Sequence, residues 1–193
     1  INLYPEVLIS TSRSYEKTYQ NLAKKYEEKI SSSLPGELDE LIKLAQNKNS
    51  LEDKVESLML AMIRKLRYQG DWRTTEGRLL PRDITQTLKE KKADCKDFST
   101  ILCAMLRQLG YKAYPCFIFR SLNFHYDMTS IVTNDTFNHA VVYVEHNEKT
   151  YFFDPTITMS YAKSIHEDIA NRPTIVLNPS KVFVTKTPDV KVE

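Results

Sequence analysis

The chain has 193 residues, 41% of them hydrophobic and 27% charged, which is the composition of one ordinary globular domain. Its 27 basic residues exceed its 25 acidic residues by only two, whereas a surface that binds nucleic acid by counterion release needs a strong basic excess. No stretch approaches the roughly 18 to 20 consecutive apolar residues that a membrane helix requires, so we expect no nucleic-acid partner and no membrane span in this segment.

The first third of the chain has the pattern of amphipathic helices. Apolar residues recur every three to four positions over 15–30, which predicts a helix that ends at a run of serines. A shorter helix is expected over 38–45, after a Pro-Gly pair. Ser50 is expected to cap a third helix whose apolar residues run over 51–66. None of these helices carries a candidate catalytic residue.

The middle of the chain begins with a stretch of loop-like composition at 68–87, and long ordered loops are usually functional. Asp83 is expected to cap a short helix that ends near Lys91, and another helix begins around Cys95 and stops at Gly110. Strand-like patterns follow at 111–119, 139–145 and 151–154, with a weaker one at 182–184. Helices first and strands later predict an α+β fold with an antiparallel sheet.

Cys95 stands where a nucleophile would be placed. The first turn of a helix offers unpaired N–H groups and the positive end of the helix dipole, and both favour the thiolate. Asp94 and Asp97 partly oppose this effect, so the thiol needs a base. Cys103 and Cys116 are expected to be structural, because three cysteines are too few and odd in number for a disulfide framework.

The predicted hairpin brings a histidine and an aspartate close together. A two-residue turn at 146–147 places His139 opposite Asp154, but it also opposes Glu145 to Glu148, which is a like-charge cost. Moving the turn one residue on makes Asp154 the diagonal neighbour of His139 on the same face. We favour the second register. Both registers allow Asp154 to orient His139 as the base that serves a nucleophile.

Three segments carry a recognisable pattern: the run 93–115, which begins Ala-Asp-Cys-Lys-Asp, the segment Phe-Asn-His-Ala-Val-Val (137–142), and Tyr-Phe-Phe-Asp-Pro-Thr (151–156). Together they resemble the transglutaminase-like superfamily, of the type found as the central module of larger bacterial proteins. The resemblance implies a papain-like fold in which the cysteine helix packs on an antiparallel sheet that bears the histidine and the aspartate. It carries the nucleophile to Cys95, the base to His139 and the orienting carboxylate to Asp154. Ala93 departs from the glycine that the family often has there.

Residues upstream of the cysteine are candidates for stabilising an oxyanion. In this superfamily and in papain-like enzymes, a Trp or Gln from such a segment can donate a hydrogen bond to the oxyanion, which points to Gln69 or Trp72. The alternative is that Trp72 lines the cleft or packs in the core. Cys95, His139 and Asp154 are also ligand types that suit zinc, but no paired Cys-x-x-Cys or His-x-x-x-His accompanies them, so we expect neither metal nor cofactor.

We expect one transglutaminase-like domain over 1–180, with a helical part at 1–66 and a triad-bearing core at 67–160. Residues 181–193 are expected to be a tail or the start of a following domain. The favoured activity is hydrolysis of a peptide, protein or amide substrate by a Cys-His-Asp triad. A protein-glutamine transglutaminase and a non-catalytic binding module on the same fold are the alternatives. Because the chain begins with an isoleucine, we expect flanking domains, and the resemblance implies a periplasmic or secreted protein.

Overall fold

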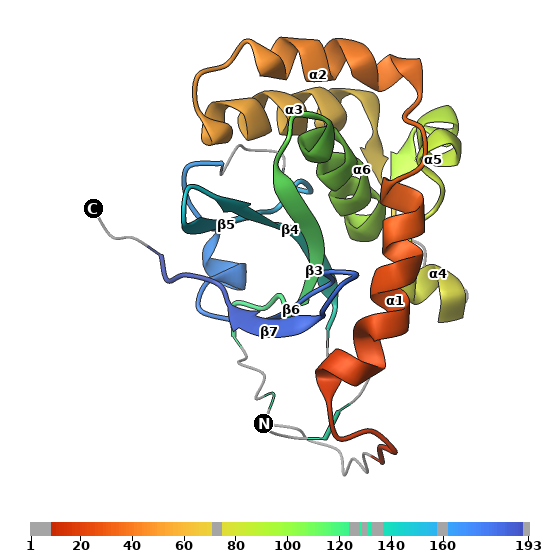
Figure 1. Ribbon diagram of the computed structural model, residues 1–193, viewed down its shortest axis with the longest axis vertical. Coiled ribbons are helices and arrows are strands. Elements are labelled where there is room, and N and C mark those ends of the chain that lie inside the picture. Colours follow the sequence, from red (N-terminus) through yellow and green to blue (C-terminus); the bar gives the residue numbers. More distant parts are fainter. Residues whose placement is uncertain are drawn as a thin grey trace.

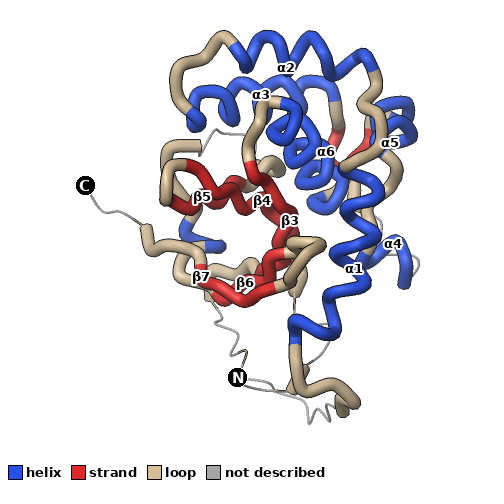
Figure 2. Tube along the Cα trace, viewed as in Figure 1, coloured by secondary structure: helices blue, strands red, loops and turns tan. Residues whose placement is uncertain are grey.

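The computed structural model describes residues 9–70, 75–123, 128, 131–132, 137–157 and 162–190. Helices cover one face of a curled five-stranded sheet (Figure 1). Figure 2 shows the helices gathered on one side of the molecule and the strands on the other. The architecture is the α+β fold predicted from the order of helical and strand-like patterns.

The long helix α1 (Tyr15–Ile30) follows the predicted amphipathic pattern. Ser14 caps its first turn by accepting a hydrogen bond from the Lys17 N–H. The helix packs against the sheet and against the cysteine-bearing helix, so its apolar stripe lies in the core. The buried members of this stripe are Tyr15, Tyr19, Ala23, Tyr26 and Ile30.

The two helices that follow pack against each other at one end of the molecule (Figure 1). A 3-10 turn, η1 (Gly36–Leu38), leads directly into α2 (Asp39–Gln46). Ser50 accepts a hydrogen bond from the Asp53 N–H at 3.1 Å and so caps α3 (Leu51–Lys65), as predicted.

The stretch at 68–87 is more structured than its composition suggests. Strand β1 (Arg67–Tyr68) pairs in parallel with β2 (Lys92–Ala93), and two short helices lie between them, α4 (Thr75–Leu79) and α5 (Ile84–Glu90). Asp83 occupies the N-cap position of α5, but the prediction that its side chain caps the helix is wrong. Its carboxylate instead accepts a hydrogen bond from the Lys29 ammonium at 2.6 Å, because that cation lies within reach on α1.

The sheet has the order β5-β4-β3-β6-β7, and every neighbouring pair is antiparallel. The strands are β3 (Lys112–Ile118), β4 (His139–His146), β5 (Lys149–Phe153), β6 (Pro173–Val176) and β7 (Phe183–Lys186). Sequence reasoning missed β6, because four residues are too short to show an alternating pattern. The edge strand β7 lies within 181–193, the segment expected to be a tail or the start of another domain.

The β4–β5 hairpin has the register favoured from the sequence. Val142 pairs with Phe153 and His146 pairs with Lys149, which puts the turn at Asn147 and Glu148. Both turn residues have positive φ, 50° and 61°, as in the tight turns that match the twist of a hairpin. His139 and Asp154 therefore lie at the open end of the hairpin, just beyond its last paired residues.

Helix α6 (Cys95–Gln108) packs against one face of the sheet and is buried along nearly all of its length. It contacts β3 and β4, and the main hydrophobic core lies between these strands and the helices. Gly110, with a φ of 86°, ends the helix as predicted. A second core covers the opposite face of the sheet and includes residues of η2 (Glu167–Ile169). This packing directs the N-terminus of α6 towards the ends of β4 and β5.

Candidate active site

The N-terminus of α6 is closed by a capping box. The Asp94 carboxylate accepts a hydrogen bond from the Lys96 N–H at 2.9 Å, and the Asp97 carboxylate accepts one from the Asp94 N–H at 2.9 Å. Cys95 is the first residue of the helix and is only 2% exposed. The capping residues thus fix the turn that carries the thiol.

The two acidic residues beside Cys95 each have a basic partner. The buried Lys96 ammonium lies 2.5 Å from the Asp94 carboxylate. Arg82 binds Asp97 through its backbone N–H at 2.7 Å and its guanidinium at 2.6 Å. Burial raises the pKa of Asp94, the Asp97 charge raises it further, and Lys96 acts against both. These basic partners therefore reduce the repulsion that the two carboxylates exert on a Cys95 thiolate.

His139 and Asp154 form a buried pair, 6% and 4% exposed. His139 Nε2 lies 2.7 Å from Asp154 Oδ2, while Oδ1 accepts hydrogen bonds from the Thr156 N–H at 3.0 Å and the Thr156 hydroxyl at 2.7 Å. Burial raises the pKa of Asp154, but His139 and the bonds from Thr156 outweigh it, so the net shift is downward. The carboxylate is therefore held both in place and in its charged form.

The structure brings Cys95 to the other side of His139. Cys95 and His139 line the same small cavity, and because Nε2 of His139 faces Asp154, Nδ1 is the atom left for the sulfur. Burial lowers the pKa of His139, yet the Asp154 carboxylate and the Cys95 sulfur outweigh burial and raise it to about 10. The three residues singled out in the sequence thus form one linear array, Cys95–His139–Asp154.

Tyr68 is a fourth residue at this site, and sequence reasoning missed it. The charge of Cys95 acts on its phenol, and its ring stacks on Phe98, a residue of the same helix as Cys95, with centroids 6.3 Å apart. Burial, followed by the charges of Cys95 and neighbouring carboxylates, raises the pKa of the phenol, so the hydroxyl keeps its proton. Tyr68 reaches the thiol because it pairs with Ala93, two residues before Cys95. A two-residue parallel pairing leaves no signal in the sequence.

The structure describes only one of the two residues, Gln69 and Trp72, that the sequence proposed as oxyanion donors. Gln69 is exposed, and its backbone N–H donates to the Ala93 carbonyl at 2.8 Å. Trp72 lies outside the described residues. Its role as a donor, cleft residue or core residue remains a prediction.

A small cavity of about 20 Å³ opens beside Cys95 and His139. This is room for about one water molecule. Its apolar walls are mostly aromatic, and its polar walls come from α4, from the start of α6 and from the residue before His139. The remaining lining residues are Tyr19, Arg78, Leu79, Lys96, Phe117, Phe137 and Asn138.

The other two cysteines have no such surroundings. Cys103 and Cys116 are fully buried, and burial raises the pKa of both thiols, that of Cys116 to about 12.

Within the described ranges, no group of three or more His, Cys, Asp or Glu side chains is arranged to hold a metal ion. None of the helices in the described part of the chain could cross a lipid bilayer.

A family profile described as the transglutaminase-like superfamily matches residues 40–155, more than half of the sequence. The chain belongs to the transglutaminase-like superfamily. The matched range contains Cys95, His139 and Asp154. No curated protein sequence matches the chain.

Two solved structures resemble the chain, and the first supports the fold. One is described as "a putative protease from Parabacteroides distasonis"; it is 15% identical, with a TM-score of 0.58 over 90% of this chain and 32% of its own length. Another, described as a TGase, is 19% identical, with a TM-score of 0.46 over 75% of this chain and 39% of its own length. The chain therefore spans about a third of the length of these proteins.

Proposed function

We propose that this transglutaminase-like domain is a cysteine hydrolase that cleaves a peptide or amide bond through a thioester. The observation that carries the proposal is the position of His139, which lines one cavity together with Cys95 and lies 2.7 Å from Asp154. A base held between a nucleophile and an orienting carboxylate is the arrangement that nucleophilic acyl transfer requires.

In the first half of the reaction, the Cys95 proton lies on Nδ1 of His139, whose raised pKa favours the charged imidazole, and the Cys95 sulfur attacks the carbonyl carbon. The C–N bond then breaks, and His139 returns the proton to the departing amine, which leaves a thioester on Cys95. In the second half, water attacks the thioester, gives a proton to His139 and releases the acid, while the sulfur leaves and recovers that proton. Asp154 keeps the imidazole in the required tautomer and stabilises its charged form.

Two donors are placed to stabilise the oxyanion of each half-reaction. One is the backbone N–H of Cys95 at the first position of α6, where helix N–H groups have no partner within the helix. The other is the Tyr68 hydroxyl, which burial of the phenol and the charge of Cys95 keep protonated. Removing one such donor typically lowers kcat by about 10²- to 10³-fold.

Water is proposed as the acceptor in the second step because it is present at roughly 55 M. An amine at millimolar concentration wins only where binding gives it an effective molarity far above bulk. No amine-binding site can be argued from the described residues beside Cys95. A protein-glutamine transglutaminase is therefore the alternative on the acceptor side.

We also propose that the domain is one module of a longer protein.

The test incubates the domain with casein and a labelled primary amine at millimolar concentration, and follows the peptides by mass spectrometry. Hydrolysis gives new peptide termini, or glutamate in place of glutamine. Both should disappear in Cys95→Ala and persist in Cys103→Ala, a matched change on the same helix. Predominant amine incorporation would overturn the hydrolase proposal in favour of a transglutaminase. No product, together with a Cys95 that does not react with iodoacetamide, would favour a binding module.

A further inference from the structure

The Asp154 carboxylate faces a second cation besides His139. Arg120 lies two residues beyond the end of β3, and its Nη1 is 3.6 Å from Asp154 Oδ2, the same oxygen that binds His139. This distance is too long for a hydrogen bond but within the range of an ion pair. The orienting carboxylate is thus shared between an imidazole and a guanidinium.

Arg120 is held in this position from several sides. Its backbone N–H donates to Asn138 Oδ1 at 2.7 Å, and its carbonyl accepts from Asn138 Nδ2 at 3.0 Å, so its backbone is tied to the residue before His139. Its Nε donates to Asp168 Oδ2 at 2.5 Å. Next to it, Ser121 donates from its N–H to the Asp168 carbonyl and accepts from the Arg172 guanidinium.

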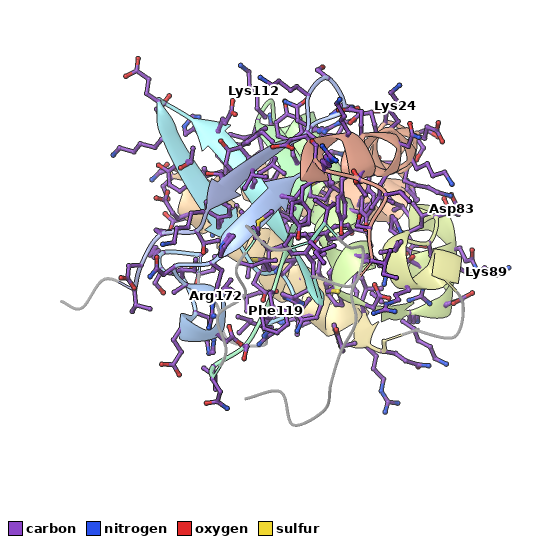
Figure 3. The ribbon with its side chains drawn as sticks, turned by 90° about the horizontal axis from the view of Figure 1, so that it is seen from below. Lys24, Asp83, Lys89, Lys112, Phe119 and Arg172 are labelled. Atoms are coloured by element: carbon purple, nitrogen blue, oxygen red, sulfur yellow. The ribbon has the colours of Figure 1, made fainter. Side chains whose placement is uncertain are left out.

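The anchoring region lies at one end of β3. Figure 3 shows Phe119 and Arg172 near each other on one side of the molecule and Lys112, at the other end of β3, on the opposite side. Asp168 is buried in η2, and its Oδ1 lies 2.7 Å from His166 Nδ1. Asp168 therefore binds the Arg120 guanidinium through Oδ2 and lies beside the His166 imidazole with Oδ1.

The charges of this array act on His139 in opposite directions. A guanidinium beside Asp154 competes with the imidazolium for the same carboxylate, and a second carboxylate behind the guanidinium offsets that competition. We propose that Arg120, anchored by Asp168, is a positioning residue that fixes the Asp154 carboxylate and sets the basicity of His139. The inference deepens the proposed function and rests on it, because His139 is the base of that reaction.

Other titratable and charged groups also lie around His139; the test changes only Arg120 and Asp168, in a background where Cys95 is replaced by alanine. On the helical side they are Cys95, which acts on the pKa of the imidazole, with Tyr68, Asp94, Lys96 and Arg78 nearby. On the sheet side they are Asp154, Arg120, Asp168 and His166.

The test is the NMR titration of the His139 imidazole in a Cys95→Ala background, where the sulfur no longer raises its midpoint. Arg120→Gln should raise the midpoint by roughly one pH unit, because the cation that shares the Asp154 carboxylate with the imidazole is lost. Asp168→Asn should lower it, because the guanidinium then has only Asp154 as its carboxylate partner. The double variant should fall between the two, and Arg120→Lys, which keeps the charge, should stay near the parent.

The matched control is Arg107→Gln. Arg107 is also a partly exposed arginine in an ion pair, 24% against 35% for Arg120, but it binds Glu27 near the far end of α6. An unchanged midpoint in Arg120→Gln, or shifts of the same sign in Arg120→Gln and Asp168→Asn, would overturn the inference. If Asp168→Asn does not fold, the two Arg120 variants still decide the question. Since the titration uses no substrate, failure of the hydrolase proposal would show separately, as absent turnover.

Discussion

Replacing Asp154 by Asn should nearly abolish turnover while the fold is retained. Asn keeps an oxygen that can accept both hydrogen bonds from Thr156, so the local turn remains satisfied. Its amide group, however, would donate to Nε2 of His139 and force the proton onto Nδ1. The imidazole would then face Cys95 with a donor and could not accept the thiol proton.

The expected size of the effect follows from the buried contact of 2.7 Å between His139 and Asp154. With charge centres about 4 Å apart and an effective dielectric of about 20, the lost attraction is about 4 kcal/mol. That corresponds to a fall of about three units in the pKa of His139, which starts at about 10. The wrong tautomer adds a kinetic penalty, so we expect kcat to fall on the order of 10⁴-fold, as in serine-protease triads.

The assay compares wild type and Asp154→Asn for casein cleavage and titrates His139 by NMR, with circular dichroism as the check on folding. Thr156→Val is a useful control, because it removes one hydrogen bond to Asp154 without changing the charge. It should lower kcat far less than Asp154→Asn. An intact fold with unchanged kcat and an unchanged His139 midpoint would refute the reasoning and leave Asp154 as a residue that merely ends a strand.

Three further predictions follow from the same geometry. In the folded protein at pH 7, iodoacetamide should alkylate Cys95 much faster than Cys103 or Cys116, whose buried thiols have raised pKa values; peptide mapping that shows equal labelling, or Cys116 first, would contradict this. Tyr68→Phe should lower kcat by about 10²-fold or more with little change in KM; an unchanged kcat would remove Tyr68 from the oxyanion site. Because the folded pKa of His139, about 10, exceeds its unfolded value of about 6.5, its contribution to stability is complete below pH 6.5 and is lost as the pH rises through 10. The Tm should therefore fall over that range in wild type and fall less in His139→Gln, and equal slopes would count against the shift.

Local chemistry explains which parts of the fold could be predicted. The hairpin register was predictable because one alternative opposed two glutamates, and in the structure Glu145 indeed lies opposite Thr150. The start of α6 was predictable from its apolar face and from Asp94, which caps it. Strand β6 was not, because Pro173–Val176 lies between β7, which follows it closely, and β3, which is distant in sequence, and this pairing, not its own pattern, makes it a strand.

The residues of the candidate site likewise divide into those that local sequence patterns predict and those that only the folded chain brings together. Cys95, His139 and Asp154 were found because a helix start and a hairpin place them by local rules. Tyr68 was missed because its approach to the thiol depends on the pairing of β1 with β2 across two intervening helices. The contact between Arg120 and Asp168 spans 48 residues of chain, so only the folded sheet brings the two together.

The central claim, that Cys95 carries the acyl group, is tested most directly by trapping that intermediate. The domain is mixed with p-nitrophenyl acetate, quenched in acid within seconds, and mapped by mass spectrometry. The account predicts one acetyl group on Cys95 that hydroxylamine removes, as expected for a thioester, and no such group in Cys95→Ala. Its formation should be strongly slowed in Asp154→Asn. An acetyl group that forms equally well in Cys95→Ala, or the absence of any adduct on Cys95, would contradict the account.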